Sequence, residues 1–290
     1  MTEYICVNGN LVSRSQAAIP VIDRGFLYGY GLFETLRVLT RGPVFWEEHM
    51  QRLEDSALQM GLHSLDRDSI KDMIFRTIEA NKLYDGSLRV TVTAGAQRGS
   101  EDKDVLGPNV VVTTKHGIPY SDSNYRLGFR AGFLEIRRNE NSPLVRLKTL
   151  NYLENILGRQ EAFRFGWDEG IFLNNRGYLC EGTVSNLFLV GKGELLTPET
   201  GSGLLPGIVR KKVMDLALEN NMQVKECRLK PRDLYEAEEA FLTNSLMGVM
   251  PLIAVNEKDI GSGAPGLMTQ LMIKEYNRLL YFLNGGNTSS

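Results

Sequence analysis

A polar, turn-rich stretch near the middle of the chain constrains the fold more than any other feature. Residues 117–124 read GIPYSDSN, and both flanks carry strand and helix patterns. Loops rich in Gly, Pro, Ser and Asn often separate one compact region from the next. We therefore predict an N-terminal domain over residues 1–118, an interdomain linker over 119–124 and a C-terminal domain over 125–290.

The N-terminal half alternates short strands with two amphipathic helices. Apolar residues alternate along 32–38 and 87–95, which is the period of a half-buried strand. Residues 4–7 followed by Asn8-Gly9 predict a strand that enters a hairpin. Helical spacing predicts helices over 47–60 and 68–82, with Asp66 and Ser69 as candidate caps of the second.

The C-terminal half mixes the two periods, so an α/β class is expected for the chain. Lys148 follows a loop over 139–143 and stands at the foot of a predicted helix. The apolar residues of that helix are Leu150, Leu153, Ile156, Leu157 and Phe163. The other predictions are strands over 125–137, 170–173, 178–190 and 239–243, helices over 209–220 and 267–283, and a disordered tail over 285–290.

Charge and composition exclude several classes of function. The formal net charge is −2, so no basic surface indicates nucleic acid or an anionic membrane as a partner. No apolar stretch approaches the roughly 20 residues of a membrane span, and the N-terminus has no signal-peptide pattern, so we expect a cytoplasmic protein. The three histidines and three cysteines lack metal-ligand spacing, so no metal site is expected.

Two charged residues stand in unusual surroundings. Lys148 lies between apolar neighbours, where the ordinary interpretation is a surface lysine whose stem packs on apolar groups. Glu181 lies inside a strand pattern that Gly182 interrupts, although strands disfavour glutamate and glycine often marks the close approach of a ligand. Its ordinary interpretation is an edge-strand charge that prevents aggregation.

Five blocks occur in order: DRGFLYGYGLFETLRV with EEHMQRL, KTLNYLENILGRQEA, DEGIFLNNRGYLCEGTVSNLFLV, LLPGIVR and FLTNSLMGVMPL. Together they resemble the class IV aminotransferase family, also called fold type IV, and the resemblance covers nearly the whole chain. That family contains branched-chain and D-amino-acid aminotransferases and aminodeoxychorismate lyase. The resemblance implies a pyridoxal 5'-phosphate enzyme with a small N-terminal α/β domain, a larger C-terminal barrel-like domain and a homodimeric state.

The resemblance also implies residue roles. Lys148 matches the lysine that binds the cofactor as a Schiff base and then acts as general acid and base. Glu181 matches the carboxylate that pairs with the pyridine nitrogen. Arg52 matches the arginine that binds the phosphate. Two loops complete the phosphate site, through the backbone at Ile208 and Val209, where the family often has threonine at 209, and through the hydroxyl of Ser245. A second departure is Tyr30, where the family usually has aspartate.

The substrate-binding residues decide between family members. Thr35, Arg98 and Asn244 resemble the lyase, which converts 4-amino-4-deoxychorismate to 4-aminobenzoate, a folate precursor, and pyruvate. Arg89 resembles an arginine of branched-chain aminotransferases, and Phe33 stands where D-amino-acid aminotransferases carry tyrosine. We predict the lyase. The alternative is a branched-chain or D-amino-acid aminotransferase that uses 2-oxoglutarate. A non-catalytic binding protein on the same scaffold is a third hypothesis, against which the presence of both Lys148 and Glu181 argues.

Overall fold

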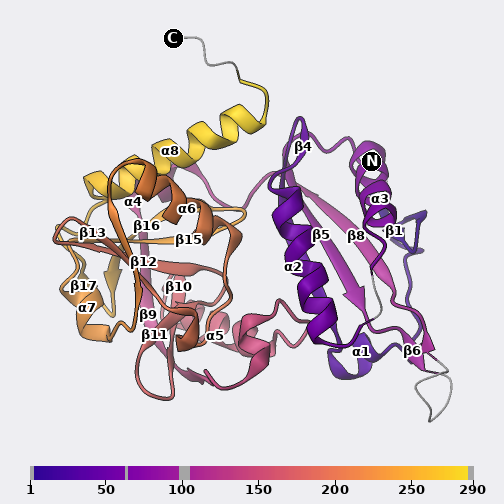
Figure 1. Ribbon diagram of the computed structural model, residues 1–290, viewed down its shortest axis with the longest axis horizontal. Coiled ribbons are helices and arrows are strands. Elements are labelled where there is room, and N and C mark those ends of the chain that lie inside the picture. The colour runs from indigo at the N-terminus through magenta and orange to yellow at the C-terminus, as the bar shows by residue number, and fades with distance from the viewer. Residues whose placement is uncertain (1–2, 63–64, 98–104, 287–290) are drawn as a thin grey trace. The chain divides into compact units, whose positions relative to one another are not determined.

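The computed structural model describes residues 3–62, 65–97 and 105–286 (Figure 1). Contacts group the chain into two compact units. Unit 1 is formed mainly by Met1–Ile118 together with Leu147–Asn151, and unit 2 mainly by Pro119–Arg146 and Tyr152–Phe282. Arg98 and the end of the tail, residues 287–290, lie outside the described residues.

Unit 1 is an antiparallel sheet covered on one face by two helices. Its strand order is β2-β1-β8-β5-β3-β4, and α2 (Trp46–Gln59) and α3 (Arg67–Ala80) pack against it (Figure 1). The strands are β1 (Tyr4–Val7), β2 (Asn10–Ser13), β3 (Gly31–Leu39), β4 (Gly42–Pro43), β5 (Gly86–Thr93) and β8 (Val110–His116). The short elements α1 (Arg24–Tyr28), β6 (Ala96–Gln97) and β7 (Val105–Leu106) complete the unit.

The alternation of apolar residues explains how unit 1 packs. Leu32, Leu36 and Val38 of β3 are buried in one cluster with Leu88 and Val90 of β5, and α2 and α3 contribute to the same cluster. The other residues of these strands therefore point to the opposite face of the sheet.

Local signals fix several boundaries in unit 1. Asp66 caps α3 as predicted, because its carboxylate accepts a hydrogen bond from the Ser69 N–H at 3.0 Å. Ser69 is thus the donor in the cap and not its acceptor. The hairpin after β1 turns through Asn8 and Gly9, which have φ of 49° and 83°, the left-handed region that such turns require.

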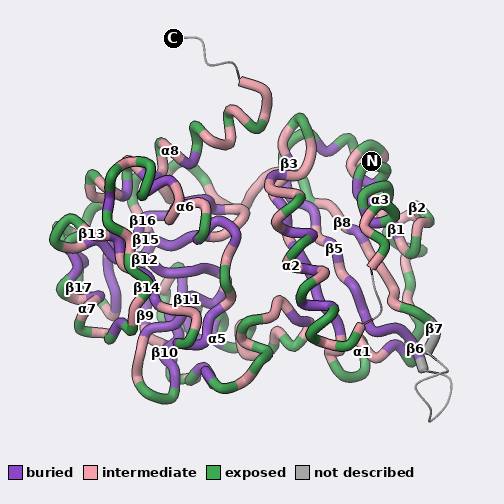
Figure 2. Tube along the Cα trace, viewed as in Figure 1, coloured by how far each residue is buried: buried purple, intermediate pink, exposed green. Residues whose placement is uncertain are grey.

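Unit 2 is built on a nine-stranded mixed sheet. Its order is β11-β10-β9-β16-β15-β12-β13-β14, with β17 paired to β16. Strands β10, β12, β15 and β16 are largely buried along their length (Figure 2). The strands are β9 (Phe129–Arg138), β10 (Glu169–Asn174), β11 (Leu179–Gly182), β12 (Asn186–Gly191), β13 (Glu194–Pro198), β14 (Gln223–Cys227), β15 (Glu239–Asn244), β16 (Gly248–Val255) and β17 (Lys258–Asp259). The helices are α4 (Asp122–Leu127), α5 (Leu153–Arg164), α6 (Ile208–Glu219), α7 (Pro231–Tyr235) and α8 (Leu267–Leu283), with short 3-10 turns at Pro143–Arg146 and Thr200–Ser202.

Two strand predictions in the C-terminal half were wrong in part. The strand predicted from residue 125 begins at Phe129, because Ser121 starts the short helix α4 through a capping box. The strand predicted over 178–190 is two strands, β11 and β12. The break between them, Thr183–Ser185, is held by side-chain hydrogen bonds described below.

The helix predicted directly after Lys148 begins later than expected. It starts at Leu153, and Leu150 instead pairs with Gly31 of β3 through its N–H at 2.9 Å. The predicted apolar residues that lie in α5, namely Leu153, Ile156, Leu157 and Phe163, are exposed, up to 83% for Phe163, whereas α5 buries Gly158, Glu161 and Ala162. Leu150 is half-buried. The periodicity therefore marked an apolar face that the described part of the chain does not cover.

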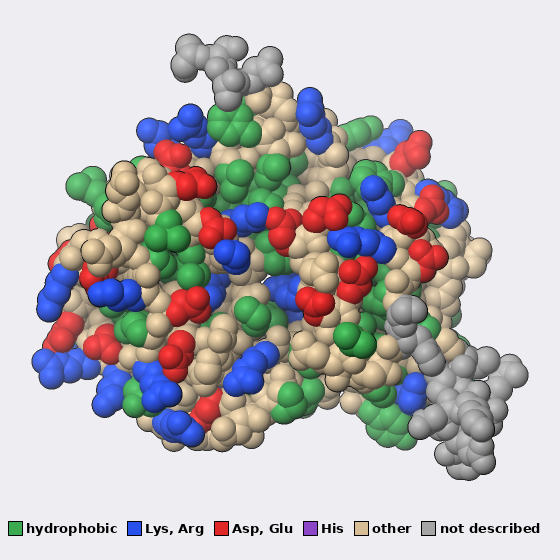
Figure 3. Space-filling view, in the orientation of Figure 1, with side chains coloured by type: hydrophobic (Ala, Val, Ile, Leu, Met, Phe, Trp, Pro, Cys, Tyr) green, Lys and Arg blue, Asp and Glu red, His purple; other side chains and the backbone are tan. Residues whose placement is uncertain are grey.

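The face of the molecule in Figure 3 carries side chains of both charges. Acidic and basic side chains are interspersed on the face that Figure 3 presents, in keeping with the net charge of −2. Among the described helices, none has the length and the apolar composition needed to cross a membrane.

Candidate active site

Lys148 is held in unit 1 by a segment that runs along the open edge of β3. The Phe33 N–H donates to the Lys148 carbonyl at 2.9 Å, and Leu32 forms a bridge with Thr149. Asn151 donates through its side chain to the Gly29 carbonyl at 2.9 Å. These bonds on both sides of Lys148 fix its backbone, and its ammonium nitrogen lies 4.5 Å from the centroid of the Phe33 ring.

Three predicted substrate residues share the sheet face that α2 and α3 leave uncovered. Thr35 of β3 is paired with Arg89 of β5, and Phe33 lies two residues before Thr35. The Arg89 guanidinium stacks 3.7 Å from the Phe33 ring centroid, and its Nε donates to the Thr91 hydroxyl at 3.3 Å. The Phe33 ring thus has both the Arg89 guanidinium and the Lys148 side-chain nitrogen near it, and Thr35 is the strand partner of Arg89.

On the opposite face, Arg52 belongs to a buried cluster with Glu34 and His49, two residues for which no role was predicted. Arg52 binds the Glu34 carboxylate with a two-point fork, from Nε to Oε1 and from Nη2 to Oε2, both at 2.7 Å. His49, one helical turn before Arg52 on α2, lies 2.7 Å from Glu34 Oε2 through Nδ1. Glu34 and His49 are each 1% exposed. The predicted phosphate arginine is therefore fixed by a buried carboxylate.

The ionisation of this cluster follows from its partners. Burial alone would raise the pKa of Glu34, but the Arg52 charge and the hydrogen bonds from His49 and Arg52 outweigh burial and lower the pKa to about 2. Burial lowers the pKa of His49, against the attraction of Glu34. His49 is therefore neutral near pH 7, and because an ionised carboxylate only accepts hydrogen bonds, Nδ1 carries its proton.

Tyr30, the departure from the family pattern, has a structural role in unit 1. Its hydroxyl donates to the carbonyl of Met60 at 2.5 Å, directly after α2 ends. The Arg24 guanidinium lies 5.2 Å from the Tyr30 ring centroid. Tyr30 thereby ties the turn before β3 to the C-terminal end of the helix that carries His49 and Arg52.

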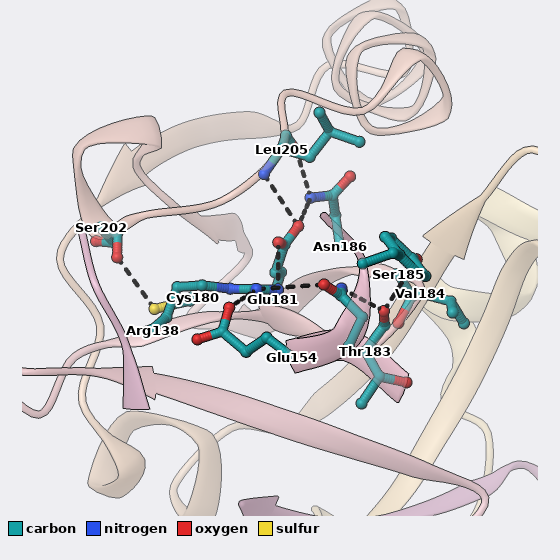
Figure 4. A network of polar contacts seen from close by, with 12 residues as sticks. Arg138, Glu154, Cys180, Glu181, Thr183, Val184, Ser185, Asn186, Ser202 and Leu205 are labelled. Carbon is teal, nitrogen blue, oxygen red and sulfur yellow. Dashed lines mark hydrogen bonds and ion pairs between the residues drawn. The ribbon is translucent and has the colours of Figure 1, made fainter. Parts of the chain in front are cut away.

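Glu181 lies in unit 2 at the centre of a polar network (Figure 4). Its Oε1 accepts from Arg138 Nη2 at 3.0 Å, and its Oε2 accepts from the Leu205 N–H at 3.0 Å and from Asn186 Nδ2 at 3.4 Å. Arg138 also forms an ion pair with Glu154. Glu181 is only 7% exposed, so the interpretation as a solvated edge-strand charge does not hold.

A second buried carboxylate shapes the break between β11 and β12. Glu169, 2% exposed, accepts hydrogen bonds from the Thr183 N–H at 3.0 Å, from the Thr183 hydroxyl, and from the Ser185 hydroxyl at 2.8 Å. The Val184 N–H adds a longer contact at 3.4 Å. The Thr183 N–H also donates to the Gly170 carbonyl at 3.0 Å, so the carboxylate adds side-chain hydrogen bonds to a segment that leaves the regular strand pairing.

The two predicted phosphate loops of unit 2 have different chemistry. Gly207 is the N-cap of α6 and offers no side-chain cap to the first-turn amides of Ile208 and Val209. The Val209 side chain is 1% exposed and belongs to the core. The second loop follows β15, where Ser245 opens a turn.

Asn244, predicted to bind substrate, uses its side chain within the loop after β15. Its Nδ2 donates to the Val184 carbonyl at 3.1 Å. Its Oδ1 accepts from the Leu246 N–H at 2.9 Å and from the Met247 N–H at 2.8 Å. Asn244 thus orders the turn that carries Ser245 and joins it to the segment that Glu169 holds.

The sequence contained signals for some of the residues that were missed. Glu34 lies on the same side of β3 as Leu32 and Leu36, and a glutamate at a core position predicts a buried partner. Arg138 gave no comparable signal, because it ends a strand that already contains Arg130 and Arg137.

Comparison with known proteins identifies the family. The family model described as Amino-transferase class IV matches residues 31–255. A putative branched-chain-amino-acid aminotransferase of Methanocaldococcus jannaschii is 32% identical over 276 residues, covering 94% of each chain. Aminodeoxychorismate lyase of Bacillus subtilis is 30% identical over 290 residues, covering 97% of each chain. The crystal structure of the T.th. branched-chain amino acid aminotransferase with pyridoxamine 5'-phosphate has a TM-score of 0.90 at 25% identity, covering 99% of this chain and 96% of that chain.

The chain belongs to the class IV aminotransferase family. Its α/β architecture is fold type IV, with an antiparallel N-terminal sheet and a half-barrel C-terminal sheet, so the predicted fold class is confirmed. It is an enzyme that uses pyridoxal phosphate, as an aminotransferase or as a lyase.

Proposed function

We propose that the protein is an aminodeoxychorismate lyase, which acts in folate biosynthesis. One observation carries the proposal: Thr35 lies beside Arg89 on the sheet face of Phe33, whose ring centroid is 4.5 Å from the Lys148 ammonium. A hydroxyl, a guanidinium and a lysine amine in one place suit a substrate with both an amino group and carboxylates. The Bacillus subtilis lyase, 30% identical over nearly the whole length of both chains, supports the same choice.

The donors in the described residues fit pyridoxal phosphate. Lys148 would bind the cofactor's aldehyde carbon, and Glu181, already surrounded by N–H donors that favour its ionised form, would pair with the pyridine nitrogen. At Gly207 the backbone is closely approached, since an added Cβ would lie 2.0 Å from Asn186 Oδ1. The residues that would hold the phosphate are Arg52, the amides of Ile208 and Val209, and Ser245.

Each of these residues would have its own role in the reaction. The cofactor supplies an electron sink that weakens the bond between the substrate's amino-bearing carbon and its proton. Lys148 would take that proton on Nζ and return it later. Glu181 would keep the pyridine nitrogen protonated. Thr35 and Arg89 would orient a carboxylate of the substrate, and Arg98 stays a predicted second contact.

The lyase reaction needs no second substrate, because every atom of its two products comes from 4-amino-4-deoxychorismate or from a proton. The proton leaves the amino-bearing carbon of 4-amino-4-deoxychorismate, and the ring carbon–oxygen bond to the enolpyruvyl group breaks with its electron pair on oxygen. The ring becomes aromatic as 4-aminobenzoate, and the departing enolate takes up a proton to give pyruvate. An aminotransferase, in contrast, needs a 2-oxo acid to accept the amino group, and this difference separates the two activities experimentally.

An aminotransferase of branched-chain or D-amino acids is the second candidate. Arg89 favours it as well, because a guanidinium beside Lys148 would equally bind the second carboxylate of 2-oxoglutarate. The Methanocaldococcus jannaschii relative, named a putative branched-chain-amino-acid aminotransferase, is 32% identical.

Three parallel assays test the choice. The purified enzyme is incubated with 4-amino-4-deoxychorismate alone, with leucine plus 2-oxoglutarate, and with D-alanine plus 2-oxoglutarate, and initial rates are compared. We expect release of pyruvate and 4-aminobenzoate to be fastest. A faster rate with either amino acid would refute the lyase and favour the aminotransferase.

Variants at Lys148 and Thr35 test the residue roles behind the proposal. Lys148→Ala should abolish all three activities, and borohydride reduction followed by peptide mapping should locate the cofactor on Lys148 in the wild type. Lys115→Ala, at an exposed lysine of β8 in the same unit, is the matched control. Thr35→Gly should lower lyase activity more than any transamination, and an equal loss of both would contradict its role in substrate choice.

We also infer a homodimer. The inference is supported by the apolar side chains that α5 leaves exposed, among them Leu153 and Phe163, and by Phe26 and Tyr28 of α1. Sedimentation equilibrium should give twice the chain mass of 32.5 kDa, and a mass of one chain at micromolar concentration would contradict the inference.

A further inference from the structure

Arg138 is a buried arginine in direct contact with Glu181. It ends β9 and is 4% exposed. Its guanidinium stacks 4.1 Å from the centroid of the Phe172 ring, and Nη2 reaches Glu181 Oε1 at 3.0 Å. Within the described part of the chain Nε is buried and makes no hydrogen bond. Arginine is rarely buried unless its charge is paired, because removing a cation from water costs free energy.

The cluster places one cation between two carboxylates. Nη1 of Arg138 pairs with Glu154 in the first turn of α5, whose side chain is 35% exposed, while Nη2 pairs with Glu181, whose side chain is 9% exposed. Water therefore partly stabilises the ionised form of Glu154. The ionised form of Glu181 depends much more on charges and hydrogen bonds from the protein. Because Glu154 shares the cation, Arg138 favours the ionised form of Glu181 without cancelling its negative charge.

The orientation of Glu181 also depends on Arg138. The Leu205 N–H and Asn186 hold Oε2, and in the network of Figure 4 Arg138 is the partner of Oε1. Without Arg138, Oε1 would lose its charged partner, so the carboxylate could rotate or take up a proton more easily. A protonated Glu181 could no longer stabilise a positive charge on a ring nitrogen.

We propose that Arg138 is a positioning residue that keeps Glu181 ionised and correctly aimed, so that the pyridine nitrogen of the cofactor, and not Glu181, carries the proton. The proposal rests on the role assigned to Glu181 above. The family resemblance of the sequence gave Arg138 no role. Under this proposal, the protonation of the pyridine nitrogen depends on the charge of Arg138, which contacts Glu181 and not the cofactor.

Nitrogen-15 NMR of the enzyme loaded with cofactor labelled at the pyridine nitrogen tests the proposal, because the chemical shift distinguishes the protonated from the unprotonated ring. Wild-type enzyme should show a protonated nitrogen over the whole pH range in which it is folded. Arg138→Gln, which removes the charge but keeps an N–H donor, should lower the proton affinity of the nitrogen at least tenfold. Arg138→Lys should restore most of the protonation, because it restores a cation.

Three further variants complete the design. Glu154→Gln is the matched control: it removes the other carboxylate partner of Arg138 and should leave the nitrogen protonated, so a deprotonated nitrogen there would point to general disturbance of the cluster and overturn the proposal. Arg138→Met keeps the apolar stem over Phe172 and replaces Arg138→Gln if that variant does not fold. A protonated nitrogen in the neutral Arg138 variants, as in wild type, overturns the proposal. If Glu181→Gln also keeps a protonated nitrogen, the role of Glu181 itself fails, which is a distinguishable result.

Discussion

Replacing Glu34 by glutamine should weaken unit 1 in a way that depends on pH. The substitution keeps the shape of the side chain but removes the charge that binds Arg52 and His49. The pKa of Glu34 is lowered from 4.5 to about 2, so the folded state favours the ionised form. At about 1.4 kcal/mol per pKa unit, this difference corresponds to about 3 kcal/mol of stability.

The sign of the pH dependence follows from the lowered pKa. The contribution of Glu34 is complete above 4.5, the pKa expected in the unfolded chain, and is lost as the pH falls towards about 2. The difference in free energy of unfolding between wild type and Glu34→Gln should therefore shrink by about 2 kcal/mol between neutral pH and roughly pH 3. Other carboxylates titrate equally in both proteins, so the difference isolates Glu34.

Urea denaturation of the cofactor-free protein, followed by far-UV circular dichroism at several pH values, measures this difference. Glu79→Gln is the matched control, because Glu79 is an exposed glutamate of α3 in the same unit. It should show little change at any pH. A difference between wild type and Glu34→Gln that stays constant with pH would refute the reasoning, since the side chain would then contribute by its shape and not by its charge.

Substitutions at three glycines give further predictions. Gly207→Ala should weaken cofactor affinity about tenfold, equivalent to about 1.4 kcal/mol. The new Cβ would lie 2.0 Å from Asn186 Oδ1 and would displace the start of α6. An absorbance titration that shows unchanged affinity would contradict this. Gly132→Ala should lower the stability of unit 2 by about 1–3 kcal/mol, because its Cβ would meet the Trp167 ring at 2.0 Å. Gly191→Ala, whose Cβ meets no other atom within 4 Å, should leave the melting temperature unchanged.

Elements with a clear period could be predicted from the sequence alone. The alternation over 32–38 lies within β3, Gly31–Leu39, and the final helix has the predicted bounds, Leu267–Leu283. In both cases the local pattern agrees with the burial that the fold imposes. The candidate site residues, Lys148 above all, were predicted from the resemblance to the class IV family and not from a period.

The geometry around those residues could not be predicted, because it depends on contacts distant in the chain. The segment that carries Lys148 is irregular since it pairs with Gly31–Phe33, more than a hundred residues earlier. Nothing near Arg52 in the sequence indicates that Glu34 is its partner. The apolar spacing over 150–163 predicted an amphipathic helix, yet periodicity reports only that an apolar face exists and not which surface covers it.

Three buried carboxylates, Glu34, Glu181 and Glu169, hold other groups of this fold in place. Glu34 and Glu181 are each paired with an arginine, and such pairs are often no more stable than apolar side chains of similar volume. We therefore infer that these carboxylates serve to orient other groups. Glu34 orients Arg52 in unit 1, and Glu181 is itself oriented towards the region that it faces in unit 2. Glu169 differs, because its described hydrogen-bond partners are all uncharged backbone and hydroxyl groups.

Glu169 therefore gives a last prediction, on the segment between β11 and β12. In Glu169→Gln the NH2 group of the amide would replace one of the two accepting oxygens, and each buried donor left without an acceptor there costs about 1–3 kcal/mol. The Thr183 N–H keeps a second acceptor, the Gly170 carbonyl at 3.0 Å, whereas Glu169 is the described acceptor of the Val184 N–H. The segment Thr183–Ser185 should loosen, and with it the turn of Asn244, which binds the Val184 carbonyl. Hydrogen exchange at the Val184 amide should accelerate at least tenfold relative to wild type, while the Leu189 amide in the core of β12 changes much less. Equal acceleration at both amides would mean that Glu169 supports the whole unit, and no acceleration would mean that the segment keeps its conformation without the carboxylate.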